Sequence, residues 1–291
     1  MGENYMNELI EQQVLTGERA LFNSKELSIK NTVFEGGESP LKESGNITVE
    51  QSIFKWKYPL WYSKIVGVHD SILLDGARAG IWYTDQVSIS HTTIDAPKTF
   101  RRSTNITLDH VDLPNADETL WMCKDISLSD VSAKGDYFAM NASNIKASNF
   151  RLVGNYSFDG CKNVEMTGAK MLSKDAFWNC ENVVISDSFI TGEYIGWNSR
   201  NLTFINCTIE SLQGFCYIDG LTLKNCRLLK TNLAFEYCKN ISADVTTSID
   251  SIKNPISGVI SAQSIGEVIF DDPGIDLNST HITIGGMKYA V

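Results

Sequence analysis

The chain repeats a short phrase of apolar and polar positions, and this repeat predicts the fold. Each phrase reads apolar, any, apolar, any, then a turn-prone polar residue, with another apolar residue three positions further on. The first apolar residue of each phrase, here called the anchor, recurs in steps of 19 to 21 residues. The anchors are Leu27, Ile47, Val66, Val87, Ile106, Ile126, Ile145, Val164, Val183, Leu202, Leu221 and Ile241.

Two more apolar positions recur in each repeat. One lies seven residues after the anchor and begins with Phe34 and Phe54, and the other lies six residues before the next anchor and begins with Leu41 and Leu60. Alternating apolar positions are typical of strands with one buried face, so three such segments predict three short strands per coil. We therefore expect an all-β fold, a single-stranded right-handed parallel β-helix of about twelve coils of 19–20 residues.

The ends of the repeat set the expected domain boundaries. We expect one β-helix domain over 1–291, with coils over 27–241, an N-terminal cap over 1–26 and a C-terminal cap over 242–291. A helix or strand at Tyr5 to Val14, and strands between Ile256 and Ile284, would cover the exposed sheet edges of the solenoid. A bacterial leucine-rich repeat is the second candidate fold, but 19 residues is short for that class.

Composition and charge narrow the partners. The net charge of −10 argues against nucleic acid or an anionic membrane as a general partner, because both require surplus Lys and Arg. No apolar run is long enough to cross a membrane and no signal-peptide pattern precedes the repeat, so we expect a cytoplasmic protein. The seven cysteines lack metal-site spacing, and most recur at small-residue positions of the repeat, so we expect reduced thiols that are mostly buried, and no cofactor.

Three N-terminal phrases resemble those of a known bacterial family. Residues 17–22 (GERALF), 37–44 (GESPLKES) and 56–62 (WKYPLWY) are similar to segments of DUF3737, a family of unknown function, and the resemblance extends over nearly the whole chain. The resemblance implies a fold of the pectin-lyase-like β-helix group. It implies no activity and no catalytic residue.

One face of the expected solenoid has the composition of a binding surface. The position five residues before each anchor should point outward, and it holds most of the tryptophans. With the polar positions beside it, this face predicts binding of a glycan or small polar ligand by Lys42, Tyr58, Trp61, Arg78, Trp82, Trp121, Trp178 and Trp197. The alternatives are tryptophans half-buried under loops, or a non-enzymatic scaffold that binds a protein or a second copy through this face.

Whether the chain is an enzyme is left open by its residues. Within the expected groove, Glu118 and Asp136 form the best acid/base pair, with Arg101 and Lys98 neutralising negative charge. An enzyme of this kind would be a carbohydrate-active lyase or hydrolase, but the Gly-His-Gly and Arg-x-Lys motifs of the galacturonases do not occur.

A second candidate site lies at a turn position of successive coils. Asp70, His91, His110 and Asp130 would lie one above the other and could bind a divalent metal. The competing interpretation is a polar turn ladder, because Asn and Asp fill the same position in other repeats.

Overall fold

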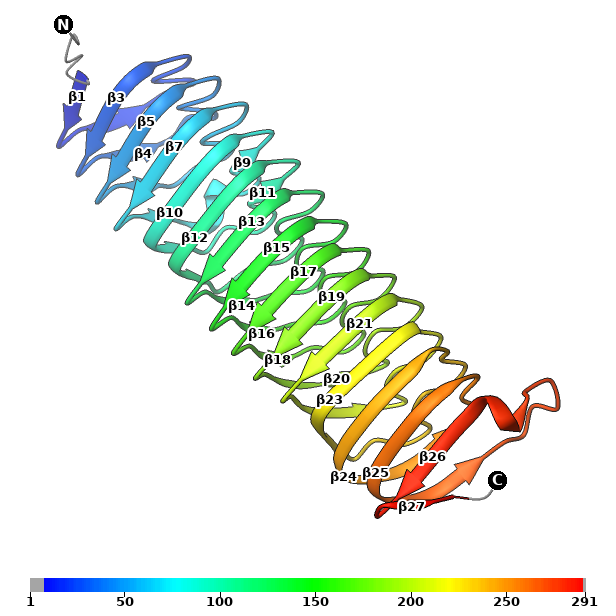
Figure 1. The fold of residues 1–291 in the computed structure, drawn as a ribbon. Coiled ribbons are helices and arrows are strands. Elements are labelled where there is room, and N and C mark those ends of the chain that lie inside the picture. The colour runs from blue at the N-terminus through cyan, green and yellow to red at the C-terminus, as the bar shows by residue number, and fades with distance from the viewer. Residues whose placement is uncertain (1–7, 290–291) are drawn as a thin grey trace, which may run out of the picture. The chain divides into compact units, whose positions relative to one another are not determined.

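The protein is an all-β parallel solenoid, as the repeat predicts. A computed structural model describes residues 8–289, and these residues form about 15 turns. The chain divides into two compact units, residues 1–145 and 146–291, which are described separately below. Within each unit the strands of successive coils lie side by side and run in the same direction (Figure 1).

Unit 1 contains two rows of parallel strands. The first-row strands are β1 (Glu8–Glu11), β3 (Lys25–Lys30), β5 (Gly45–Glu50), β7 (Lys64–His69) and β13 (Lys124–Ser129). The second-row strands are β2 (Val14–Thr16), β4 (Val33–Glu35), β6 (Ile53–Phe54), β8 (Ile72–Leu73) and β14 (Ser132–Lys134). In two coils a single strand supplies both rows, namely β10 (Asp85–Ile94) and β12 (Thr104–Leu113). The strand β15 (Ser143–Ser148) includes the boundary between the units.

Unit 2 repeats this plan and then lengthens it. Its shorter strands are β16 (Arg151–Val153), β17 (Lys162–Thr167), β18 (Lys170–Leu172), β19 (Glu181–Ser186), β20 (Phe189–Glu193), β21 (Arg200–Ile205) and β22 (Thr208–Leu212). Longer strands follow as β23 (Asp219–Leu229), β24 (Ile241–Lys253) and β25 (Gly258–Ile269), and the last strands are β26 (Thr280–Ile284) and β27 (Met287–Lys288).

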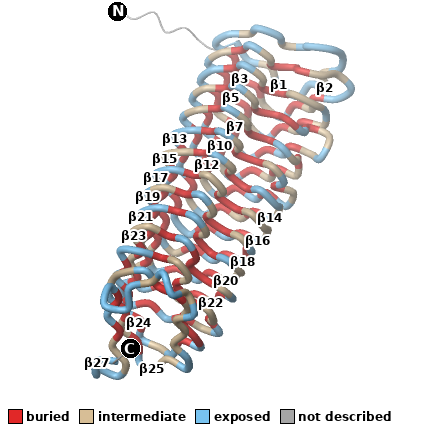
Figure 2. Tube along the Cα trace, turned by 90° about the vertical axis from the view of Figure 1, so that its right-hand side faces the viewer, coloured by how far each residue is buried: buried red, intermediate tan, exposed pale blue. Residues whose placement is uncertain are grey.

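The anchor positions set the register between coils. Leu27 pairs with Ile47, and Ile47 pairs with Val66, so each anchor lies directly over the next. The same holds in unit 2, where Val183 pairs with Leu202. The anchors and the residues two positions later are buried and form the core, and Figure 2 shows buried positions recurring from coil to coil. Burial of one strand face fixes the register, because a one-residue slip would expose every anchor.

Left-handed backbone turns the chain at the corners of each coil. The residue just before the anchor is left-handed in successive coils, as at Asn163, Asn182 and Asn201. Asparagine tolerates this conformation, and its amide can also bond along the stack. Asn182 Nδ2 donates to Asn163 Oδ1 at 3.1 Å, and Asn201 Nδ2 donates to Asn182 Oδ1 at 3.0 Å. The asparagines before the anchors therefore form a hydrogen-bonded ladder along the stack.

Most coils contain two strands instead of the predicted three. The third apolar position is buried as predicted, as at Leu41 and Leu60, but its backbone forms turns. Left-handed residues such as Glu43 and Tyr62 lie close by and interrupt the extended backbone. The third segment forms strands only at β9 (Ile81–Trp82) and β11 (Phe100–Arg101) in the described chain.

The coils extend beyond the predicted boundaries at both ends. The predicted N-terminal cap contains β1 and β2, which pair in parallel with β3 and β4, so residues from Glu8 onward belong to a coil. The predicted element at Tyr5 to Val14 is thus partly strand, and its residues 5–7 lie outside the described residues. The predicted C-terminal cap contains β25 and β26, which also stack in parallel, and only β27 runs antiparallel. These additional coils explain why the predicted number was too low.

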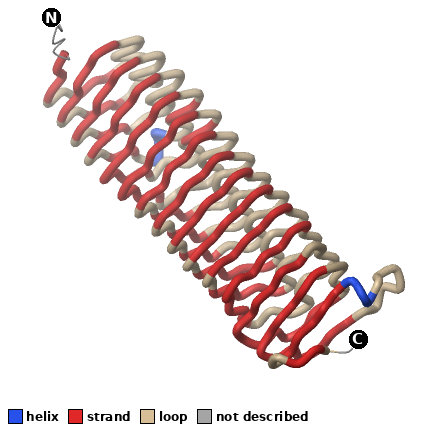
Figure 3. The backbone as a smooth tube through the Cα atoms, in the orientation of Figure 1, coloured by secondary structure: helices blue, strands red, loops and turns tan. Residues whose placement is uncertain are grey.

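Helix is a minor component of this structure. In residues 8–289 it is confined to the 3-10 turns η1 (Asp75–Ala77) and η2 (Leu277–Ser279), drawn in blue in Figure 3. Neither turn has the length that a membrane-crossing helix needs.

Four of the cysteines, Cys123, Cys161, Cys180 and Cys238, occupy a buried position that serine fills in other coils. Cys180 and Ser199 occupy the same position of successive coils, three residues before the anchor. The Cys180 thiol donates to the Phe158 carbonyl at 3.0 Å, and the Ser199 hydroxyl donates to the Phe177 carbonyl at 2.8 Å. All seven cysteines are buried and free, including Cys216, whose repeat position was expected to point outward, and burial raises the pKa of Cys123 and Cys180 to about 12.

Adjacent valines in β19 give a direct test of the register. Val183→Ala should lower the free energy of unfolding by about 2 kcal/mol, because it removes buried methyl groups from the anchor row. Val184→Ala should change it by less than about 0.5 kcal/mol, because Val184 points outward. Urea unfolding measures both values, and equal losses would contradict the assigned register.

The buried thiols should make the protein less stable in alkali. Above their ordinary pKa of 9.0, Cys123 and Cys180 ionise when unfolded but stay protonated when folded, up to about pH 12. Their contribution is complete below pH 9 and is lost as the pH rises, by about 1.4 kcal/mol per pH unit per thiol. Unfolding free energies at about pH 8 and about pH 10 should therefore fall less in Cys180→Ser than in the wild type. An unchanged pH slope in this variant would contradict the assignment.

Candidate functional site

The tryptophans of unit 1 form one continuous stack with an arginine. The Trp61 and Trp82 rings stack with centroids 5.3 Å apart and planes 10° apart. The guanidinium carbon of Arg101 lies 4.5 Å from the Trp82 ring centroid and 4.7 Å from that of Trp121. Backbone pairing of Arg101 with both tryptophans sets this order. The geometry brings these four predicted side chains together in one row, here called the tryptophan row.

Stacking covers several flat faces of the tryptophan row. Trp61 and Trp82 cover one face of each other, Arg101 lies between Trp82 and Trp121, and the three tryptophans are half-buried. The indole nitrogens of Trp82 and Trp121 donate to the carbonyls of Lys98 and Tyr137 at 2.8 and 2.6 Å, and that of Trp61 donates to Ala79. Sugar rings could therefore contact the edges of these indoles but could not stack on the covered faces.

A neighbouring row is more exposed and was missed by the sequence analysis. It lies one residue after the tryptophan row and is here called the tyrosine row, with the members Tyr62, Tyr83, Arg102 and Met122. The rings of Tyr62 and Tyr83 stack with centroids 4.9 Å apart, and 47% and 38% of these residues are exposed. All four residues have left-handed backbone. The signal was an aromatic residue four positions before two successive anchors.

The predicted acid/base pair lies on neighbouring coils. The Glu118 amide donates to the Asp136 carbonyl at 2.9 Å, so Glu118 is equivalent to Tyr137 in the repeat and Asp136 is equivalent to Asp117. The Glu118 carboxylate oxygens are held by Lys98 Nζ at 3.0 Å and by Arg101 at 3.3 Å. Glu118 therefore stabilises the cation of the tryptophan row, and a proton transfer from it would require these ion pairs to open. The catalytic roles of Glu118, Asp136, Arg101 and Lys98 stay predictions.

The other predicted ligand residues of unit 1 surround the two rows. The Tyr58 ring lies 4.4 Å from the Trp61 ring, and Lys42 Nζ lies 5.7 Å from the centroid of Tyr62. Arg78 is exposed. Among the described residues, neither Arg78 nor Arg102 has a carboxylate within ion-pair distance. These two guanidinium groups are therefore available to an anionic or hydroxyl-bearing ligand.

Unit 2 contains an aromatic row of its own. The Trp178 and Trp197 rings lie 5.0 Å apart at 45°, and Trp178 donates from its indole nitrogen to the Tyr194 carbonyl at 2.8 Å. Trp197 contacts Tyr217, which stacks on Tyr237. As in unit 1, the tryptophans are half-buried, and the next residue position carries the more exposed side chain.

The predicted metal residues form a ladder, and only some of its side chains lie close together. The His91 and His110 rings stack 5.1 Å apart, and His110 Nδ1 lies 3.0 Å from Asp109 Oδ1. Within the described chain, donor atoms of Asp109, His110 and Asp130 lie within 4.8 Å of one another. The arrangement fits the turn ladder, and metal binding by Asp70, His91, His110 and Asp130 stays a prediction.

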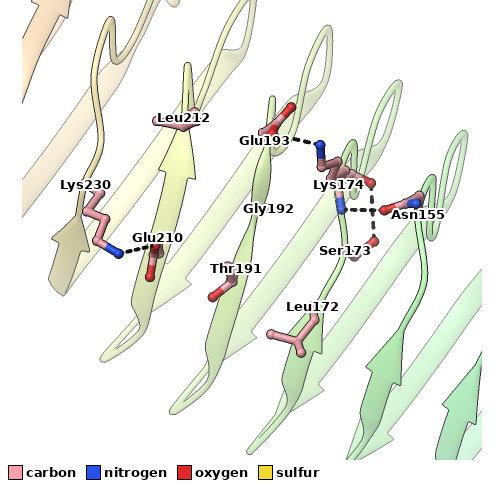
Figure 4. A pocket seen from close by; sticks show the side chains of 10 residues that line it. All are labelled: Asn155, Leu172, Ser173, Lys174, Thr191, Gly192, Glu193, Glu210, Leu212 and Lys230. Atoms are coloured by element: carbon pink, nitrogen blue, oxygen red, sulfur yellow. Dashed lines mark hydrogen bonds and ion pairs between the residues drawn. The ribbon is translucent and has the colours of Figure 1, made fainter.

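A groove in unit 2 was also missed by the sequence analysis. It lies over β18, β20 and β22 and has a volume of about 410 Å³ (Figure 4). Its walls carry Leu172, Lys174, Thr191, Glu193, Glu210 and Leu212. The signal was a row of small residues, Ser173, Gly192 and Ser211, at one repeat position between two rows of larger ones.

Several solved structures have a distant similarity to this chain. The A-module of mannuronan C-5 epimerase from Azotobacter vinelandii is 10% identical, with a TM-score of 0.28, over 93% of this chain and 91% of that one. The surface adhesin PfbA of Streptococcus pneumoniae is 8% identical, with a TM-score of 0.36, over 96% and 80%. A family 28 exopolygalacturonase of Yersinia enterocolitica is 8% identical, with a TM-score of 0.31, over 99% and 74%.

Comparison of the sequence with curated proteins and with family models identifies one family. No curated protein matches the chain. The family model described as a protein of unknown function, DUF3737, matches residues 8–283, so the resemblance of the N-terminal phrases is confirmed and the chain belongs to the DUF3737 family.

Proposed function

We propose that unit 1 binds a carbohydrate or a related hydroxyl-rich ligand along the tyrosine row. The observation that carries the proposal is the exposed, stacked pair Tyr62 and Tyr83, followed in the same row by Arg102, which has no ion-pair partner in the described chain. Exposed aromatic side chains beside polar groups are typical of binding surfaces.

The tryptophan row contacts the tyrosine row through ring edges, with centroids 6.3 Å apart for Trp61 and Tyr62 and 6.4 Å apart for Trp82 and Tyr83. Trp61 and Trp82 stack on each other and Arg101 is held by Glu118, so the side chains beside the tyrosines are held in place before a ligand arrives. Tyrosine has few rotatable bonds, and stacking restricts them further. These tyrosines therefore lose little conformational entropy on binding, which strengthens their affinity for a hydroxyl-rich ligand.

Polar groups along the row suit hydroxyl and acidic substituents. The Tyr62 and Tyr83 hydroxyls can donate or accept, and the Arg78 and Arg102 guanidiniums each offer several fixed donors. Because Glu118 is held by two cations, the proposal is binding, and it assigns no proton transfer to Glu118.

A second candidate function is self-association through the same surface. Met122 of the tyrosine row is 41% exposed, Phe22, two coils before Trp61 at the same repeat position, is 40% exposed, and Tyr137 beside Trp121 is 38% exposed. A second copy could cover these groups. Sedimentation over a range of protein concentrations separates the candidates, because only self-association makes the apparent mass depend on concentration.

Replacement of Tyr83 tests the proposed carbohydrate surface. Tyr83→Asn retains a residue that tolerates left-handed backbone and removes the ring, so binding on a glycan array should weaken at least about ten-fold, or about 1.4 kcal/mol. Tyr217→Asn is the matched control, since Tyr217 has the same repeat position, left-handed backbone and 48% exposure in unit 2. Equal binding by the wild type and Tyr83→Asn would contradict the proposal.

Replacement of Arg102 tests the preference for acidic substituents. Arg102→Gln should weaken binding of a uronate-containing glycan more than binding of its neutral counterpart, because only the former loses an ion pair. Titration calorimetry at two salt concentrations measures the difference. A loss that is the same for both glycans would show that Arg102 contributes no charge recognition.

A further inference from the structure

The groove of unit 2 arises where the repeat places small residues between two outward rows. One outward row contains Leu172, Thr191 and Glu210, which pair with one another across β18, β20 and β22. The other contains Glu193 and Leu212, which are also paired. These two rows form the walls of the groove, and in Figure 4 their side chains extend from adjacent strands.

The floor of the groove has no room for larger side chains, because the coils approach closely there. A Cβ on Gly192 would lie 2.0 Å from the Ser173 carbonyl oxygen, so only glycine fits. Its neighbours in the row, Ser173 and Ser211, are short and fully buried. The hollow of about 410 Å³ is therefore a consequence of backbone packing, and its size is within the usual range for small-ligand sites.

The charges on the walls cancel. Lys174 Nζ lies 2.9 Å from Glu193 Oε1, and Lys230 Nζ lies 3.1 Å from Glu210 Oε1 (Figure 4). A charged ligand would have to compete with one of these ion pairs for its partner. A neutral ligand can instead accept from the ammonium groups and donate to the carboxylates while both pairs remain.

Apolar side chains lie on both walls beside these polar groups. Leu172 and Leu212 are each 51% exposed, which leaves half of each side chain to contact a ligand. Thr191 contributes a hydroxyl between them. A ring with hydroxyls around its edge and C–H groups on its faces matches this combination. Its hydroxyls can bond to the ion-paired polar groups, and its C–H groups can pack on the leucine methyls.

We propose that the unit 2 groove binds a neutral saccharide. This inference does not depend on the tyrosine row, which belongs to unit 1 and occupies another position of the repeat. The ligand lies over Ser173 and Gly192, with its hydroxyls bonded to the two Lys–Glu pairs and its C–H groups against the leucines.

The experiment uses the full chain and neutral trisaccharides: maltotriose, cellotriose and N-acetylated chitotriose. Trigalacturonate is the charged counterpart. Ligand-observed NMR and titration calorimetry should detect at least one neutral trisaccharide with a Kd of about 1 mM or tighter. Trigalacturonate should bind at least about ten-fold more weakly than that trisaccharide.

Two variants place the binding in the groove. Thr191→Trp fills the hollow from an outward strand position that accepts large aromatic residues, and it should weaken binding at least about ten-fold. Thr208→Trp is the matched control, since Thr208 lies in the same sheet but does not line the groove, and its affinity should equal that of the wild type. Thermal unfolding of both variants checks that each is folded.

The results that would overturn the inference are specific. Absence of binding by every neutral trisaccharide, tighter binding of trigalacturonate, or equal affinity of Thr191→Trp and the wild type would each do so. Saccharide binding that persists in Thr191→Trp but is lost in Tyr83→Asn would assign the site to the tyrosine row. In that case the groove proposal fails while the proposed function stands.

Discussion

Parallel backbone hydrogen bonds between successive coils constrain every other feature of this protein. Because the anchors pair one to one, as Val183 pairs with Leu202, each side chain lies over the residue one repeat later. Every position must therefore be compatible with stacking on its neighbours. Apolar residues satisfy this condition inside the coil, and at the left-handed corners asparagine does so through ladders such as Asn163, Asn182 and Asn201.

Stacking also limits where a ligand can bind. The side chains of one row contact one another and leave little surface for a ligand. Trp61 covers Trp82, for example, and Arg101 separates Trp82 from Trp121. Surface remains available where a row is displaced outward or interrupted. The tyrosine row of unit 1 is an example of the first situation, and the hollow over Gly192 in unit 2 is an example of the second.

The candidate sites were predictable in part from the repeat. The repeat placed Trp61, Trp82, Arg101 and Trp121 in one row, since equivalent positions of stacked coils must be neighbours. It did not give the contacts of Glu118, because Lys98 and Arg101 reach it through side-chain conformations that a repeat does not specify. It also could not distinguish half-buried Trp82 from more exposed Tyr83, since this depends on the backbone turn between adjacent residues.

By itself the sequence determined the solenoid class, the anchor register and the buried thiols, because periodic burial leaves a periodic pattern of apolar and small residues. Only the tertiary structure decided that most coils have two strands, since that depends on left-handed corners at residues such as Glu43 and Tyr62. It also decided that coils begin by Glu8 and continue through β26, because backbone pairing there persists after the side-chain pattern has decayed. The depth of the groove over Gly192 likewise depends on how closely two backbones approach, which no single position of the sequence records.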